Sequence, residues 1–213
     1  MNSLEGVMVV GLTGQTGAGK STVSKTFREY GFVLINADII SREVVEKGSS
    51  CLAEIKDCFP ESVISPDGTL NRRELASIIF SDVSKKELLN SIMYPYIVGR
   101  ILQEIHEYAD EGRKMILLDA PTLFESRADD FCELIISVVA KEPLRLERIM
   151  KRDSLTQEQA QQRIDSQLPE SFFIGHSDFI IKNNKDRTNL DEISKEVAEM
   201  VVKYYHEKFE EVI

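Results

Sequence analysis

Residues 7–22 read Val-Met-Val-Val-Gly-Leu-Thr-Gly-Gln-Thr-Gly-Ala-Gly-Lys-Ser-Thr, and this stretch decides the fold. Its apolar start, residues 7–10, predicts a buried strand. The strand runs into Gly14-x-x-x-x-Gly19-Lys20-Ser21, the complete pattern of a phosphate-binding loop. Glycine lets the backbone curl around a phosphate, so that amide N–H groups and the positive end of the following helix face the anion. The alternative is a glycine-rich turn that binds nothing, and the strand–loop–helix context argues against it.

The loop predicts a site for a nucleoside triphosphate. We expect Lys20 to reach the β- and γ-phosphates and Ser21 to place its hydroxyl on Mg²⁺. The residues expected to contact the nucleotide here are Gly14, Gln15, Thr16, Gly17, Ala18, Gly19, Lys20, Ser21 and Thr22.

Composition limits the classes of protein that remain. The 213 residues, 42% hydrophobic and 29% charged, fit one soluble globular domain with room for inserted lobes. A net charge of −10 argues against nucleic acid as a partner, and a polyphosphate ligand would need positive charge gathered locally. No apolar run reaches the roughly 20 residues of a membrane span, and the start lacks a secretory signal. We therefore expect a cytoplasmic protein without a membrane partner.

Three further apolar runs and one short run predict a parallel α/β sheet. They cover residues 31–38, 114–121, 134–140 and 179–181, and the first two carry aspartates at their ends, Asp38 and Asp119. The carboxyl ends of parallel strands line the ligand crevice. Asp119 is therefore a candidate for the metal-associated carboxylate. Asp38 is a candidate for chemistry, with an ordinary helix cap paired to Arg42 as the alternative.

Two helical regions separate these strands. Residues 50–110 contain no convincing strand, and short helices are expected at residues 71–80 and 85–93, with Pro95 beginning or kinking the next one. After residue 140, Arg145, Arg148 and Arg152 share one helix face. Such a helix suggests a mobile lid whose guanidinium groups neutralise a transferring phosphoryl group, unless the face is merely solvated.

Several motifs, taken in order, resemble the dephospho-coenzyme A kinase family. They are residues 11–22, Asn36-Ala37-Asp38-x-x-x-Arg42, Asp67-Gly68-x-Leu70-Asn71-Arg72, residues 121–125, Arg148-x-x-x-Arg152, Arg163-x-x-x-Gln167 and Ser177-Asp178 to Asn183. The resemblance runs from the loop to about residue 190. The sequence departs from the family pattern at Asn36, Asn71, Tyr94, Thr122 and Arg145.

The resemblance implies a P-loop kinase with a five-stranded parallel sheet flanked by helices, a helical acceptor-binding lobe and a helical lid. The core would cover about residues 1–49, 111–142 and 175–213, the lobe about 50–110 and the lid about 143–174. The implied reaction moves the γ-phosphoryl group of ATP, with Mg²⁺, to the ribose 3′-hydroxyl of dephospho-coenzyme A. The implied catalytic residues are Asp38 as general base, Lys20 and Arg148. Arg148, Arg152 and Asn183 would contact ATP, and Asp38, Arg42, Phe80 and Tyr94 the acceptor.

Two other functions remain open on the sequence alone. One is a kinase for another small hydroxylated or nucleotide acceptor on the same scaffold. The other is a nucleotide-dependent switch, against which the lid arginines and the order Asn184-Lys185-Asp186 count, because a guanine-specific loop needs Asn-Lys-x-Asp. The oligomeric state is not set by the sequence.

Overall fold

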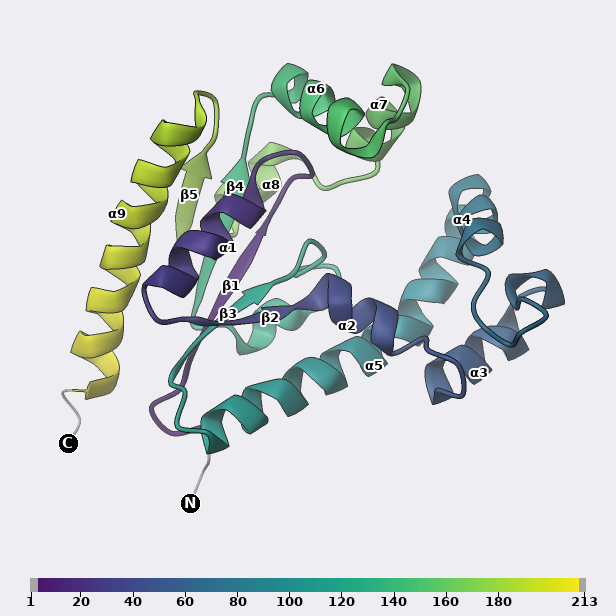
Figure 1. Cartoon of the computed structure of the whole chain (residues 1–213), viewed down its shortest axis with the longest axis horizontal. Helices are drawn as coiled ribbons and strands as arrows, with labels where there is room; N and C mark the ends of the chain where they lie inside the picture. The colour runs from purple at the N-terminus through teal and green to yellow at the C-terminus, as the bar shows by residue number, and fades with distance from the viewer. Residues whose placement is uncertain (1–3, 211–213) are drawn as a thin grey trace. The chain divides into compact units, whose positions relative to one another are not determined.

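Five strands form one sheet in the order β2-β3-β1-β4-β5 (Figure 1). The computed structural model describes residues 4–210. The strands are β1 (Met8–Gly14), β2 (Val33–Asn36), β3 (Met115–Asp119), β4 (Leu134–Val139) and β5 (Phe179–Lys182). Each of the pairs β1–β3, β1–β4 and β4–β5 is parallel. The prediction of a five-stranded parallel α/β sheet is therefore confirmed.

The burial of the central strand β1 accounts for the continuous apolar run in its sequence. All seven of its residues are buried, because β3 and β4 flank it and helices cover both faces. Val10 pairs with Leu117 on one side and with Leu134 on the other. Strands buried in this way have continuous apolar sequences instead of an alternating pattern.

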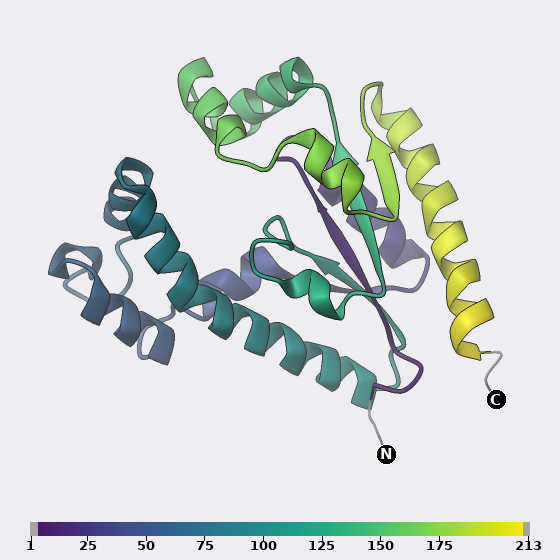
Figure 2. The same cartoon turned by 180° about the vertical axis from the view of Figure 1, so that it is seen from behind.

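Helices cover the two faces of the sheet. On one face, α1 (Lys20–Glu29) packs against α9 (Arg187–Tyr205), and Figure 1 shows α1 in front of the central strands with α9 alongside β5. Figure 2 shows the opposite face, where α8 (Glu170–Gly175) packs against β4. Two more helices, α6 (Glu142–Asp153) and α7 (Gln157–Asp165), lie between β4 and β5 in the chain. Shorter helical turns cover Glu61–Val63, Ala128–Phe131 and His206–Glu210.

The chain divides into two compact units. Within the described residues, the first holds 4–35 and 106–210, and the second holds Asn36–Ile105. The second unit is helical, with α2 (Ala37–Glu43), α3 (Ser50–Cys58), α4 (Arg72–Ser81) and most of α5 (Val83–Asp110). It has an apolar core of its own, formed by Val45, Cys51, Ile55, Phe59, Val63, Leu75, Leu89 and Ile92.

Two predictions about local structure are wrong. Residues 85–93 do not form a separate short helix. They belong to α5, which has 28 residues and continues through Pro95. A proline inside a helix removes one hydrogen bond. Burial of α5 residues on both sides of the proline, Leu89 and Ile92 before it and Ile97 and Ile101 after it, offsets that loss.

The strand predicted at residues 31–38 also ends early, at Asn36. The side-chain oxygen of Asn36 accepts hydrogen bonds from the N–H groups of Asp38 and Ile39 and so begins α2. Asp38 therefore lies in the first turn of a helix instead of at the end of a strand. No helix within residues 4–210 has the length and apolar character needed to cross a membrane.

Candidate functional site

The phosphate-binding loop connects the end of β1 to the start of α1, as predicted. Gly14 has φ +126°, and a Cβ atom there would lie 2.1 Å from the carbonyl oxygen of Val138. Only glycine permits this close approach to β4. The loop therefore rests directly on the two central strands, and its backbone is available to surround an anion at the N-terminus of α1.

Two predicted phosphate and metal ligands lie at the first turn of α1. Lys20 is its first residue, and its Nζ donates a 3.2 Å hydrogen bond to the carbonyl oxygen of Gly14. The Lys20 side chain thus reaches back from the start of α1 to the first residue of the loop. Ser21 is exposed at the next position, where a hydroxyl can meet a bound metal ion.

Arg148 and Asn183 meet the loop from two other elements of the first unit. Arg148 comes from α6, and its guanidinium donates to the carbonyl oxygens of Gly17 at 3.3 Å and Asn183 at 3.4 Å. Asn183 follows β5 and is buried, and its Nδ2 donates a 2.7 Å hydrogen bond to the carbonyl oxygen of Ala18. The structure therefore brings together three parts of the predicted nucleotide site: the loop, the arginine of α6 and the asparagine after β5.

Arg145 and Gln167 hold the loop at Thr16, and sequence reasoning did not identify either of them as a loop contact. The Arg145 Nε donates to the carbonyl oxygen of Thr16 at 3.0 Å, and its Nη2 donates to Gln167 Oε1 at 3.0 Å. The same Oε1 accepts the N–H of Thr16 at 2.9 Å, which closes a ring of three residues. Gln167 stands in a motif quoted for the family resemblance, and that was the only signal of its importance.

Arg152 lies elsewhere on α6. Its side chain is 60% exposed, and its Nε and Nη2 donate to the two carboxylate oxygens of Asp153, each at 2.8 Å. Arg163 of α7 contacts the same carboxylate. The hydrogen bonds and charge of Arg152, with those of Arg163, hold the pKa of Asp153 below its usual range. The prediction that Arg152 contacts ATP stays a prediction.

Asp119 is the carboxylate that the sequence predicts as a ligand of Mg²⁺. It is the last residue of β3, and it pairs in register with Leu12 of β1, two residues before the loop. Within residues 4–210, no group of three histidine, cysteine, aspartate or glutamate side chains could hold a metal ion. Mg²⁺ needs no such group, because it retains water and takes substrate phosphates as ligands alongside one or two protein oxygens. Ser21 and Asp119 therefore fit this ion chemically.

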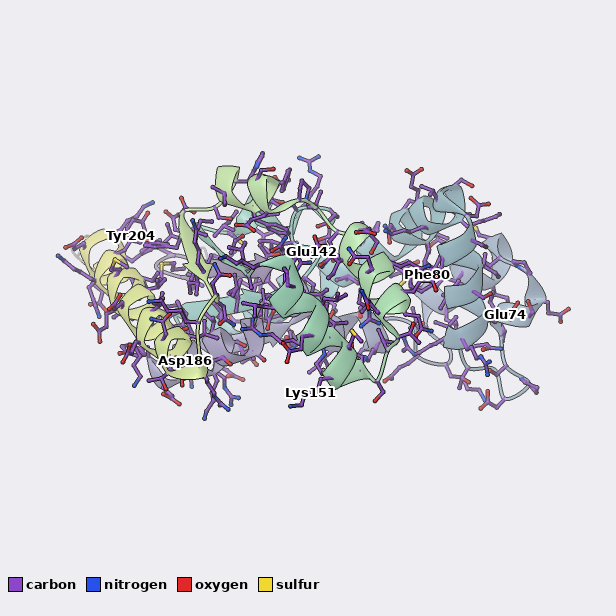
Figure 3. The ribbon with its side chains drawn as sticks, turned by 90° about the horizontal axis from the view of Figure 1, so that it is seen from above. Glu74, Phe80, Glu142, Lys151, Asp186 and Tyr204 are labelled. Atoms are coloured by element: carbon purple, nitrogen blue, oxygen red, sulfur yellow. The ribbon has the colours of Figure 1, made fainter. Side chains whose placement is uncertain are left out.

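The residues predicted to contact an acceptor belong to the second unit. Asp38 is exposed in the first turn of α2, and Arg42 lies in the last turn of the same helix. Phe80, near the end of α4, is 79% exposed, an unusual environment for a large apolar side chain (Figure 3). Tyr94 is half-buried within α5, directly before Pro95.

A parallel sheet with this loop, a lysine on the following helix and arginines on a helix after β4 defines a P-loop kinase of the small-molecule type. The family model for dephospho-CoA kinase matches residues 8–189. The chain belongs to the dephospho-CoA kinase family.

Three known proteins show the extent of the similarity. The chain is 39% identical over 199 residues to a dephospho-CoA kinase of Listeria innocua, covering 93% of this chain and 98% of the relative. The structure of the dephospho-CoA kinase from Campylobacter jejuni superposes with a TM-score of 0.68 at 27% identity, covering 92% of this chain and 97% of that one. Shikimate kinase from Acinetobacter baumannii, with a TM-score of 0.51 at 14% identity over 95% and 97% of the two chains, shares the fold.

Proposed function

We propose that this protein transfers the γ-phosphoryl group of ATP to the ribose 3′-hydroxyl of dephospho-coenzyme A. The products are coenzyme A and ADP, which makes the reaction the last step of coenzyme A biosynthesis. The observation that carries the proposal is the phosphate loop of a dephospho-CoA kinase family member, intact in sequence and held by Arg148 and Asn183.

The loop, residues 14–22, binds the triphosphate through its backbone N–H groups. Lys20 supplies positive charge at the loop, and a phosphate oxygen can replace the Gly14 carbonyl as an acceptor of its Nζ. Ser21 and Asp119 would hold Mg²⁺, which would supply positive charge to offset the negative charge of the phosphates. Asn183 lies beside the loop and lines the adenine side of the site.

The lid covers about residues 143–174 and includes α6 and α7. Arg148 and Arg152 neutralise charge on the transferring phosphoryl group, and closure of the lid excludes water, which would otherwise compete as acceptor. Support for a role of Arg148 comes from its contact with Gly17, which keeps a cation at the edge of the loop.

The acceptor is bound by the helical lobe, about residues 50–110, together with α2. Asp38 accepts the proton of the 3′-hydroxyl as it attacks the γ-phosphorus. Its exposure in the first turn of α2, which leaves the carboxylate open to a substrate hydroxyl, supports this role. Arg42, Phe80 and Tyr94 contact the remainder of the acceptor. We expect the reaction to take place in the cytoplasm.

One assay tests the proposal. ATP consumption is measured with and without dephospho-coenzyme A, and the product is identified by mass spectrometry. We expect dephospho-coenzyme A to stimulate turnover and to gain one phosphoryl group on the ribose. If another hydroxylated acceptor stimulates turnover and dephospho-coenzyme A does not, the acceptor assignment is wrong. A Lys20→Met variant should lose turnover with every acceptor.

A further inference from the structure

The guanidinium of Arg145 is a buried charge in contact with the phosphate loop at Thr16. The residue is 3% exposed. Within residues 4–210, its guanidinium donates hydrogen bonds to neutral oxygens, the carbonyl of Thr16 and the side-chain amide of Gln167. A buried ion is ordinarily paired with an opposite charge, because neutral acceptors do not offset the lost hydration in full.

Two carboxylates attract Arg145 only through space. Glu142 lies at the exposed start of α6 (Figure 3), and its Oε1 accepts a hydrogen bond from Gln161 at 3.1 Å. Glu170 is exposed in the first turn of α8. Burial outweighs both and lowers the pKa of Arg145 from its ordinary value. Residues 4–210 therefore compensate the positive charge of Arg145 only in part.

The contacts of Arg145 also orient the loop. The C=O and N–H groups of one planar trans peptide point in opposite directions. Because the Thr16 carbonyl points at Arg145, the N–H of Gly17 points away from it. A loop that binds phosphate through its backbone needs its N–H groups turned to the anion, and Arg145 fixes one of them.

We propose that a triphosphate bound in the loop is the counter-anion of Arg145. The buried guanidinium places positive potential beside the loop at Thr16 and strengthens triphosphate binding without touching the ligand, so Arg145 is a positioning residue. This inference rests on the proposed function, since it places the triphosphate at residues 14–22. It also answers how a chain of net charge −10 attracts a polyanion.

The first test is Arg145→Gln, which removes the charge and keeps a hydrogen-bond donor for Thr16. Binding of the imido analogue of ATP with Mg²⁺ is measured by calorimetry. We expect Kd to rise roughly three- to tenfold, the range for one charge acting across several ångströms at an effective protein dielectric. KM for ATP should rise with Kd, and kcat at saturating ATP should change less than twofold, by our estimate. The melting temperature without nucleotide should not fall.

The second test is Gln167→Glu, which is nearly the same shape. Its carboxylate still accepts the N–H of Thr16, and it adds the counter-charge that Arg145 lacks. We expect a higher melting temperature without nucleotide together with weaker nucleotide binding. If Arg145 and Gln167 only brace the loop, the stronger ion pair would leave binding unchanged or tighten it, and that result would overturn the proposal.

Two control variants complete the set. Arg145→Lys keeps the charge and should bind the analogue within about twofold of the wild type, because its Coulomb term is retained. Arg113→Gln makes the same charge change at an exposed residue directly before β3. This residue lies at the N-terminal end of the parallel strands, and the loop lies at their C-terminal end. It should leave Kd unchanged.

The outcomes separate this inference from the proposed function. If the folded wild type binds the analogue and both Arg145→Gln and Gln167→Glu bind it equally well, the inference alone is wrong. If the folded wild type does not bind the analogue, the proposed function is wrong. Should Arg145→Gln fail to fold, Gln167→Glu decides by the same comparison with the wild type.

Discussion

Asn183 Nδ2 donates a 2.7 Å hydrogen bond to the carbonyl oxygen of Ala18 and so joins the end of β5 to the phosphate loop. The two residues are 165 positions apart in the chain. Asn183 also accepts from Arg148 through its backbone oxygen, so one buried side chain and its own carbonyl connect the loop to α6.

Replacing Asn183 with alanine should therefore loosen the loop. The Ala18 carbonyl would lose its buried donor, and the free energy of unfolding should fall by about 1–3 kcal/mol. KM for ATP should rise as well. Urea unfolding and steady-state kinetics measure both effects. Asn184→Ala is the control: Asn184 is exposed and bonds the N–H of Lys141, so its loss should cost less. Equal losses in the two variants would contradict the importance of the Ala18 contact.

Gly17→Ala should damage the loop more than its backbone angle alone explains. Gly17 has φ +76°, and a Cβ there would lie 2.9 Å from the carbonyl oxygen of Arg145 on α6. Gly112 has the same φ and nothing within 4 Å of a Cβ, so Gly112→Ala measures the backbone strain by itself, about 1–2 kcal/mol. The difference in unfolding free energy between the two variants reports the collision with α6. Similar losses of unfolding free energy in the two variants would show that α6 shifts to accommodate the added Cβ without a measurable loss of stability.

Asp38→Asn should abolish most transfer and keep nucleotide binding. Removing a general base typically costs 10²–10⁴-fold in rate. The loop residues are unchanged, so Kd for ATP should stay within about twofold, by our estimate from the unaltered loop contacts. Stopped assays for product and calorimetry for ATP separate the two quantities. Glu43→Gln, an equal loss of charge at the exposed end of α2, should retain full activity. Undiminished transfer by Asp38→Asn would remove the residue from the role of base.

Asp153 should make the α6–α7 segment sensitive to acid. Its pKa is lowered, first by the hydrogen bonds from Arg152 and then by the charges of Arg152 and Arg163. A carboxylate with a lowered folded pKa adds stability that is complete above its unfolded value near 4 and is lost as pH falls through the folded value. The stability difference between the wild type and Asp153→Asn should therefore be constant from about pH 5 to 7 and shrink below pH 4. A difference that does not change with pH down to about pH 2 would contradict this linkage.

The sequence predicted the elements that follow local rules. Apolar runs revealed β1, β3 and β4 because these strands are buried. Glycine spacing revealed the loop. The capping box at Thr156 follows an equally local rule, with the side chains of Thr156 and Gln159 each bonded to the other's backbone N–H. Such features depend on neighbours within a few residues, so a single sequence contains them.

What the sequence did not predict depends on partners far apart in the chain. Gln167 bonds the N–H of Thr16, 151 residues away, and no periodicity encodes that contact. The sequence pattern places Arg145 on a helix face with two other arginines. Only the packed structure shows that it is buried and contacts the loop at Thr16. The end of β2 was misplaced because Asn36 is equally suited to end a strand or to cap a helix.

The helix α5 determines where this chain can change in length. It passes from the second unit into the first between Ile105 and His106, without a loop at that boundary. Adding one residue there would turn the helix beyond it by about 100° around the axis relative to Ile101 and Ile105. Insertions and deletions among relatives should therefore fall in the segments between helices, such as the turn at Gly48.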